Sequence, residues 1–163
     1  MKKIVLAAAM VALSSGSAYA ASTSGSASAI VVSPISVSHN AGASLNFGSF
    51  TAGTGGTVAV TSGGSGSVTG GAGGVTFVSG YVNSADAFTV NGDGSRGFTI
   101  STASGSVNDG FGNSMPFTTT PSAATGTLSG GTASFTVGGT LTVGSGQTAN
   151  PYSGSYLATV NYQ

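Results

Sequence analysis

Apolar and polar residues alternate along most of the chain. The longest alternating run covers residues 132–143, where Phe135, Val137 and Leu141 share one face and serine, threonine and glycine lie between them. A period of two is typical of strands that bury one face, so the pattern predicts β-strands. Further runs cover residues 155–162 and the pairs Val58/Val60, Val75/Phe77, Phe88/Val90, Phe98/Ile100 and Met115/Phe117.

Turn clusters separate these runs. Glycine, asparagine, aspartate and serine gather at residues 53–56, 63–67, 70–74, 91–95 and 144–146, and such clusters mark turns. The sequence contains no helical stripe of apolar residues, and no period of 20–50 residues repeats, which argues against a solenoid. The pattern therefore predicts an all-β, immunoglobulin-like β-sandwich of about seven or eight short strands.

The amino-terminal residues have the pattern of an export signal. Lys2 and Lys3 precede an apolar stretch at residues 4–13, and Ala18-Tyr19-Ala20 fits the small-x-small rule for cleavage. The stretch is too short to span a bilayer, which takes about 20 residues. The alternative, a buried amino-terminal helix, does not fit the strand pattern downstream. We expect residues 1–20 to be a signal peptide and the protein to be exported.

Very little charge remains after residue 20. The charged fraction of the chain is 4%, whereas an ordinary soluble domain has about 25%, and a near-neutral surface promotes association. The chain has no cysteine, so its stability must come from burial and sheet hydrogen bonds rather than from disulfides. We expect an exported chain of this kind to associate with its own copies.

The segment after the signal differs from the rest of the chain. Residues 21–29 contain only alanine, serine, threonine and glycine, a composition that does not order by itself. Ala27, Ala29 and Val31 place small apolar groups on one face of an extended chain, so the segment either enters a groove in another molecule or is a flexible leader. The chain thus divides into a signal at residues 1–20, an extension at residues 21–32 and a sandwich at residues 33–163.

Three motifs carry a resemblance to a known family. Residues 45–49 read L-N-F-G-S, residues 51–58 read T-A-G-T-G-G-T-V, and residues 152–156 read Y-S-G-S-Y. Over roughly residues 35–162, the chain resembles a family of small exported bacterial β-proteins catalogued as a domain of unknown function. Its layout is also similar to the spore-coat-U-like subunits of archaic chaperone–usher pili, although this chain lacks their cysteine pair.

The resemblance to these pilins implies assembly by strand donation. Their sandwiches are incomplete, and a periplasmic chaperone fills the resulting groove until the extension of the next subunit replaces it at an outer-membrane usher. For this chain, the resemblance implies a homopolymer of identical subunits on the cell surface. The implied donor positions are Ala27, Ala29, Val31 and Val32, and the implied groove-bordering positions on the terminal strand are Tyr156, Ala158, Val160 and Tyr162.

The chain offers little catalytic chemistry. A hydrolase needs a nucleophile–base pair or two paired carboxylates, and His39 is the only histidine. It precedes Asn-Ala-Gly, a turn composition that predicts exposure to solvent. Ser65 and Ser145 lie in Gly-Ser-Gly turns rather than at a strand-to-helix junction, and one arginine after residue 20 gives no phosphate-binding patch. We expect neither an enzyme nor a nucleic-acid partner.

Two oxygen-rich turns are weak candidates for a calcium ion. Residues 91–95 read N-G-D-G-S, with oxygen side chains at alternate positions as in the first half of a calcium loop. Residues 107–110 with Asn113 form the second turn. The first lacks the closing glutamate and is also typical of an ordinary hairpin, so our main expectation is no metal and no cofactor. The candidate ligands are Asn91, Asp93 and Asp109.

Three functions fit these observations to different degrees. A structural subunit of a surface fibre or pilus, with roles in adhesion and biofilm, explains both the low charge and the small-residue extension. A monomeric secreted adhesin or other binding module has no need of the extension. A functional amyloid fits the low charge, but not the abundant glycine, the absence of repeats and the scarcity of glutamine. The sequence therefore predicts the fibre subunit.

Overall fold

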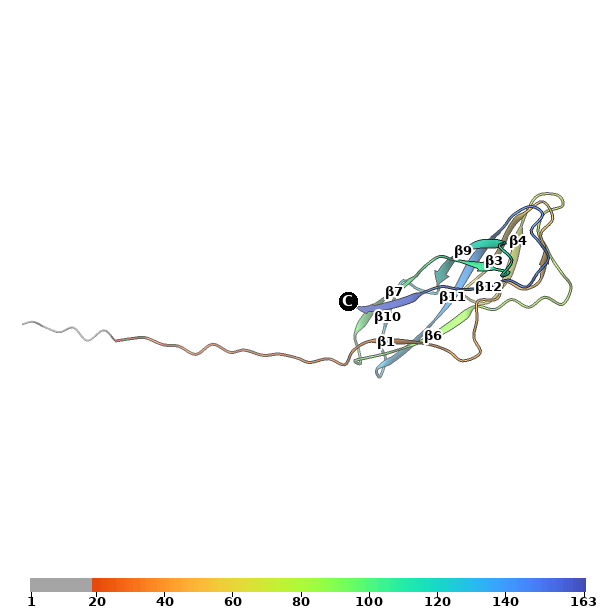
Figure 1. The fold of residues 1–163 in the computed structure, drawn as a ribbon. Coiled ribbons are helices and arrows are strands. Elements are labelled where there is room, and N and C mark those ends of the chain that lie inside the picture. The colour runs from red at the N-terminus through yellow and green to blue at the C-terminus, as the bar shows by residue number, and fades with distance from the viewer. Residues whose placement is uncertain (1–18) are drawn as a thin grey trace, which may run out of the picture. The chain divides into compact units, whose positions relative to one another are not determined.

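The computed structural model describes residues 19–163, and residues 1–18 of the expected signal lie outside the described residues. Within residues 19–163 the regular structure is all β and antiparallel, which confirms the predicted fold class (Figure 1). The strands are β1 (Ser36–His39), β2 (Phe50–Thr51), β3 (Gly56–Val60), β4 (Gly66–Thr69), β5 (Thr76–Phe77), β6 (Asp86–Asn91), β7 (Gly97–Thr102), β8 (Gly105–Asn108), β9 (Ser114–Pro121), β10 (Thr125–Thr127), β11 (Thr132–Val143), β12 (Ser153–Ser155) and β13 (Ala158–Tyr162).

The described part of the chain divides into two units, the first ending at Val31 and the second covering Val32–Gln163. In the described part of the first unit, residues 19–31 form no strand and every residue is exposed. The second unit contains strands β1 to β13 and both core clusters. No helix in the described part of the chain is long and apolar enough to cross a membrane.

The main sheet is organised around β11. Its strand order is β1-β6-β11-β9-β8-β12, and β3 and β4 join it because β3 also pairs with β11. The first half of β11 pairs with β6, and the second half lies between β3 and β9. At Gly138, where this change of neighbours begins, a Cβ would lie 2.3 Å from the carbonyl oxygen of Val60. Only glycine allows the two strands to approach so closely.

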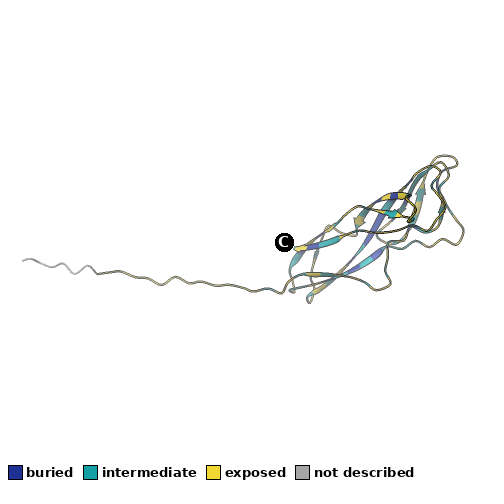
Figure 2. Ribbon diagram, viewed as in Figure 1, coloured by how far each residue is buried: buried dark blue, intermediate teal, exposed yellow. Residues whose placement is uncertain are grey.

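A three-stranded sheet of order β10-β7-β13 packs against β1, β6 and the first half of β11 in the main sheet. One core cluster lies between them, with Phe88 and Phe135 from the main sheet and Phe98 and Val160 from the smaller one. A second cluster, under β3, β9 and the second half of β11, contains Phe47. Buried positions alternate with exposed ones along the strands (Figure 2), so the predicted sandwich and its inward faces are confirmed.

Two details of the strands differ from the prediction. The described residues contain thirteen strands rather than seven or eight, because short strands such as β2, β4, β8 and β10 form outside the alternating runs. The expected terminal strand at residues 155–162 is also divided. β12 pairs with β8 in the main sheet, whereas β13 pairs with β7 in the smaller one. The chain therefore crosses from one sheet to the other at Tyr156 and Leu157.

Candidate functional site

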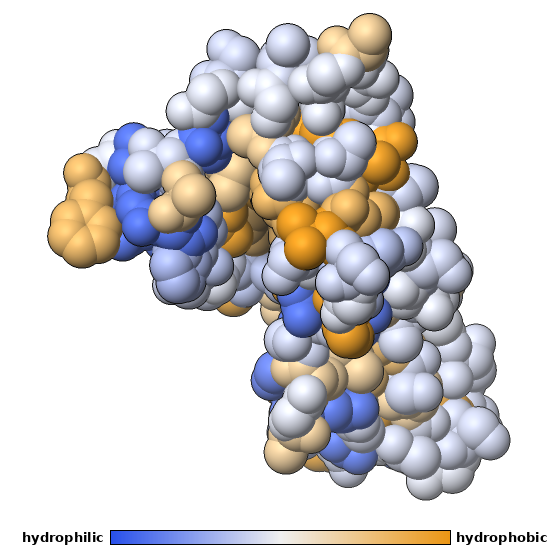
Figure 3. Space-filling view, turned by 90° about the vertical axis from the view of Figure 1, so that its right-hand side faces the viewer, coloured by the Kyte–Doolittle hydropathy of each residue, from blue (hydrophilic) through white to orange (hydrophobic). Residues whose placement is uncertain are grey.

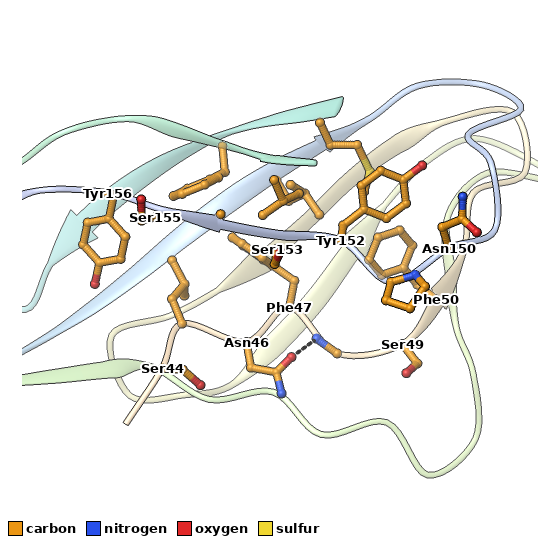
Figure 4. A pocket seen from close by; sticks show the side chains of 18 of the residues that line it. Ser44, Asn46, Phe47, Ser49, Phe50, Asn150, Tyr152, Ser153, Ser155 and Tyr156 are labelled. Carbon is orange, nitrogen blue, oxygen red and sulfur yellow. Dashed lines mark hydrogen bonds between the residues drawn. The ribbon is translucent and has the colours of Figure 1, made fainter. Parts of the chain in front are cut away.

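A groove opens onto the core between two segments of the sandwich. Residues 43–52, which follow β1, form one side, and residues 147–156, which include β12, form the other (Figure 4). Its volume of about 1090 Å³ exceeds the 300–1,000 Å³ typical of small-molecule pockets. The lining is mostly apolar and includes Leu45, Phe47, Phe50, Phe88, Val107, Met115, Phe117, Leu141, Tyr152 and Tyr156.

The L-N-F-G-S motif builds the first side of the groove. Phe47 belongs to the core cluster and the partly buried Leu45 packs against it, while the backbone of Asn46 forms a bridge with Ser84 of the chain that leads into β6. The side-chain oxygen of Asn46 accepts a hydrogen bond of 2.9 Å from the Gly48 N–H, and Gly48 has a φ of +76°, which glycine adopts without strain. The motif thus turns the chain while keeping its apolar side chains in the groove.

The second side of the groove ends in an unpaired strand edge. β12 pairs with β8 and is the last strand of the main sheet, so no strand in residues 19–163 pairs with its other edge. Residues 44–50 and 152–156 run along opposite sides of the groove (Figure 4). An edge strand presents free N–H and C=O groups and is a template for another chain. The unpaired backbone groups of β12 therefore lie next to the apolar side chains of the groove, and another chain could bind to both.

A polar cluster of His39, Asp86 and Tyr156, called the Asp86 cluster below, closes one end of the groove. Asp86 is 5% exposed. Its Oδ1 lies 2.6 Å from Nε2 of the half-exposed His39 and accepts a hydrogen bond from the Ala87 N–H. Its Oδ2 accepts a hydrogen bond of 2.8 Å from the Tyr156 hydroxyl. Three partners therefore satisfy the one buried charged group in the described part of the chain.

Tyr156 is held as a hydrogen-bond donor. Burial, and then the hydrogen bond to the Asp86 carboxylate and its charge, raise the pKa of Tyr156 far above its ordinary value of 10.0. The ring also packs edge-on against Phe88 and Phe117, with centroids 6.2 and 6.1 Å away. The His39 ring and the Tyr156 hydroxyl thus contact different oxygens of the same carboxylate.

The residues predicted to border the groove lie in two places. Tyr156 lines the groove, whereas Ala158, Val160 and Tyr162 lie in β13 and pack into the cluster between the sheets. Val160 is buried, as its position in the alternating run predicted. The Tyr162 hydroxyl accepts a hydrogen bond of 2.6 Å from the Asp93 N–H and donates one of 2.8 Å to the Ser33 carbonyl.

The predicted donor residues lie at the end of the extension. Ala27, Ala29 and Val31 are exposed, and Val32 is partly buried. None of these four residues belongs to a strand. Their role in binding another molecule stays a prediction.

The oxygen-rich turns hold their carboxylates in internal contacts. Asp93 Oδ2 accepts a hydrogen bond of 2.8 Å from Arg96 Nε, and Asn91 is the last residue of β6. Asp109 accepts hydrogen bonds from the side-chain amides of Asn113 and Asn150 and from the backbone of its own loop. No group of three or more His, Cys, Asp or Glu side chains that could hold a metal ion occurs in residues 19–163.

The loop around Asp109 is expected to respond to acid. The amide of Asn113, together with that of Asn150 and the N–H groups of Phe111 and Asn113, lowers the pKa of Asp109 from 3.8 to about 2. Because the folded-state pKa is lower, the stabilisation is complete above pH 3.8 and is lost as the pH falls toward 2. Thermal midpoints of the wild type and Asp109→Asn should differ at pH 6 and converge by pH 2. A gap that stays constant over this range would contradict the prediction.

Comparison with known proteins gives one match. Searches of the curated proteins and of the solved structures found no match. A protein family described as "Domain of unknown function (DUF4402)" matches residues 35–162. The matched range contains all of the strands from β1 to β13 and both sides of the groove. It confirms the predicted family and leaves the likeness to spore-coat-U-like pilins as a prediction. The chain therefore belongs to the DUF4402 family of domains of unknown function.

Proposed function

We propose that the protein is a structural subunit of a bacterial cell-surface fibre, in which residues 21–32 of one copy occupy the groove of the next. The observation that carries the proposal is the groove itself, which exposes apolar core side chains beside the free edge of β12. An added strand would satisfy both features at once, because it supplies backbone partners to the edge and side chains to the groove. The fibre is then a homopolymer.

The extension has the chemistry that this groove requires. In an extended chain the odd-numbered positions face one way, and here they are Ala21, Thr23, Gly25, Ala27, Ala29 and Val31. These side chains are small, which suits a groove whose lining already contains bulky aromatic side chains. The opposite face of residues 21–28 consists of serine, which can remain in water. Twelve residues extend about 40 Å at about 3.3 Å per residue, enough to follow a side of the groove about ten residues long.

The surface also favours association between copies. A space-filling view shows mostly pale, weakly polar side chains, with apolar ones in orange exposed among them (Figure 3). Val82 and Leu157 are each 67% exposed, and the whole chain has a formal net charge of zero. Little electrostatic repulsion therefore opposes contact between subunits.

A subunit with an unfilled groove needs protection before it is assembled. A free strand edge beside exposed apolar side chains is an aggregation hazard. We propose that the signal peptide directs export, that a periplasmic chaperone covers the groove, and that an outer-membrane usher exchanges the chaperone for the next subunit. No metal and no catalytic reaction are part of this function.

The proposal is tested on material sheared from the surface of the producing cells. We expect a ladder of multimers in SDS without boiling, and a single band at the mass of one subunit after boiling, because a donated strand is held firmly but not covalently. Deletion of residues 21–32 after the signal is the control and should leave the monomer alone. A monomer in both wild-type lanes would contradict the proposal and favour a binding module. Material that stays in the well after boiling would favour amyloid.

A further inference from the structure

The groove is open along only part of the sandwich. Its lining ends at the Asp86 cluster and at Phe88, which pairs with His39, and it includes no residue of β13. Beyond the cluster, Cα atoms of β1 and β13 approach within 8 Å of one another, although these strands belong to different sheets and do not pair. A strand inserted between two others holds them about 9.5 Å apart, twice the usual spacing. The space between β1 and β13 is therefore closed to an incoming strand.

The Asp86 cluster joins the two sides of the groove at this point. His39 ends β1, and the chain continues from it into the first side, at residues 43–52. Tyr156 ends the second side. Asp86 lies on β6 between them and bonds to both, at 2.6 Å to His39 and 2.8 Å to Tyr156. Hydrogen bonds to a charged group are stronger than those between neutral groups, so one carboxylate ties the two sides together.

We propose that the Asp86 cluster is a gate within the groove, which an incoming strand must open in order to pass between β1 and β13. This inference rests on the proposed function. The open part of the groove is filled first, by addition to the edge of β12. Completion then requires the bond between Tyr156 and Asp86 to break so that β1 and β13 can separate. Insertion accordingly has a fast step and a slow step, and the cluster controls the slow one.

The test measures insertion of a fluorescein-labelled peptide with the sequence of residues 21–32 into the mature chain. The chain carries Ala29→Asp so that its own extension does not compete. Tyr156→Phe keeps the ring and removes the hydroxyl that bonds to Asp86. We expect it to accelerate the slow step at least tenfold, which corresponds to about 1.4 kcal/mol of barrier.

Tyr81→Phe is the matched control. Tyr81 does not line the groove, and its ring stacks on Phe77 with the centroids 3.9 Å apart, outside the Asp86 cluster. The control should insert the peptide at the rate of the parent chain. Equal rates for the two phenylalanine variants would overturn the gate, as would a slower Tyr156→Phe.

A second variant keeps the test decisive if Tyr156→Phe does not fold. His39→Ala removes the bond from the other side of the groove at a half-exposed position, and it should also accelerate the slow step. An unchanged slow step in His39→Ala would overturn the gate. Failure of the peptide to bind any chain, the parent included, would overturn the proposed function and the gate together. Binding in a single phase that no variant changes would overturn the gate alone.

Discussion

A mature chain with Ala29→Asp is expected to fold and to remain monomeric. Ala29 belongs to the odd-numbered series of the extension, whose side chains face the groove in the proposed fibre. Most of the groove lining is apolar, and its one buried carboxylate, Asp86, already has its partners. A buried unpaired carboxylate costs several kcal/mol or more, so the donated strand would not dock. Light scattering after size-exclusion chromatography measures the effect directly.

Ser28→Asp provides the control for this substitution. It introduces the same charge at the adjacent residue, whose side chain faces away from the groove if residues 21–32 form a strand. We expect Ser28→Asp to polymerise as the wild type does. Loss of polymers in both variants would mean that charge in the extension matters but its alternation does not. Normal polymers from Ala29→Asp would exclude the odd-numbered face from the groove.

Much of the fold could be predicted from the sequence because one buried face imposes a period of two. The run at residues 132–143 is a single strand with the same limits, β11. The pairs Phe88/Val90 and Phe98/Ile100 lie in the core on facing sheets. These predictions hold because burial of alternate side chains is a local property of each strand, which the order of residues records directly.

Pairing between distant strands was harder to predict. Apolar residues recur at Tyr156, Ala158, Val160 and Tyr162, although β12 and β13 belong to different sheets. The side-chain period stays at two when a strand changes partners, and at the crossing only Leu157, an apolar residue in the polar series, departs from the pattern. The end of the groove lies at this crossing, and its position therefore emerged only from the structure.

One residue of the Asp86 cluster, Asp86 itself, could be recognised from the sequence. Asp86 is two positions before Phe88 and four before Val90, so the period of two places its carboxylate on the buried face of β6. A buried acid needs partners. Those partners are His39 and Tyr156, which are 47 and 70 residues away. The alternation could have identified Asp86, but not the residues that bind it, and His39 was predicted only as a solvent-exposed turn residue.

The absence of charged residues from β12 and from residues 43–52 is consistent with the addition of a strand at the edge of β12. A chain that remained monomeric would gain from charges around an open strand edge, since charged edge residues prevent pairing with other chains. β12 reads Ser-Gly-Ser, and the opposite side of the groove, residues 43–52, contains no charged residue. This edge lacks the usual protection, which is what strand addition requires.

Val160→Asp is expected to unfold the sandwich or to lower its thermal midpoint by about 10 °C or more. Val160 is 8% exposed and pairs with Ile100 in the small sheet, where it packs into the cluster between the sheets. No cationic side chain belongs to that cluster, so the new carboxylate would be buried without a partner at a cost of several kcal/mol. Native domains are stable by only about 5–15 kcal/mol, and about 1 kcal/mol shifts the midpoint of a domain of this size by about 3 °C. Export should fall with stability.

Asn161→Asp separates burial from charge in this experiment. Asn161 is the next residue of β13, is exposed, and would carry the same new charge. A surface substitution of this kind usually changes stability by no more than about 0.5 kcal/mol, so its midpoint and its export should match those of the wild type. If Val160→Asp were as stable as Asn161→Asp, the carboxylate at position 160 would have to reach water. That result would mean that β13 does not cover the core between the two sheets.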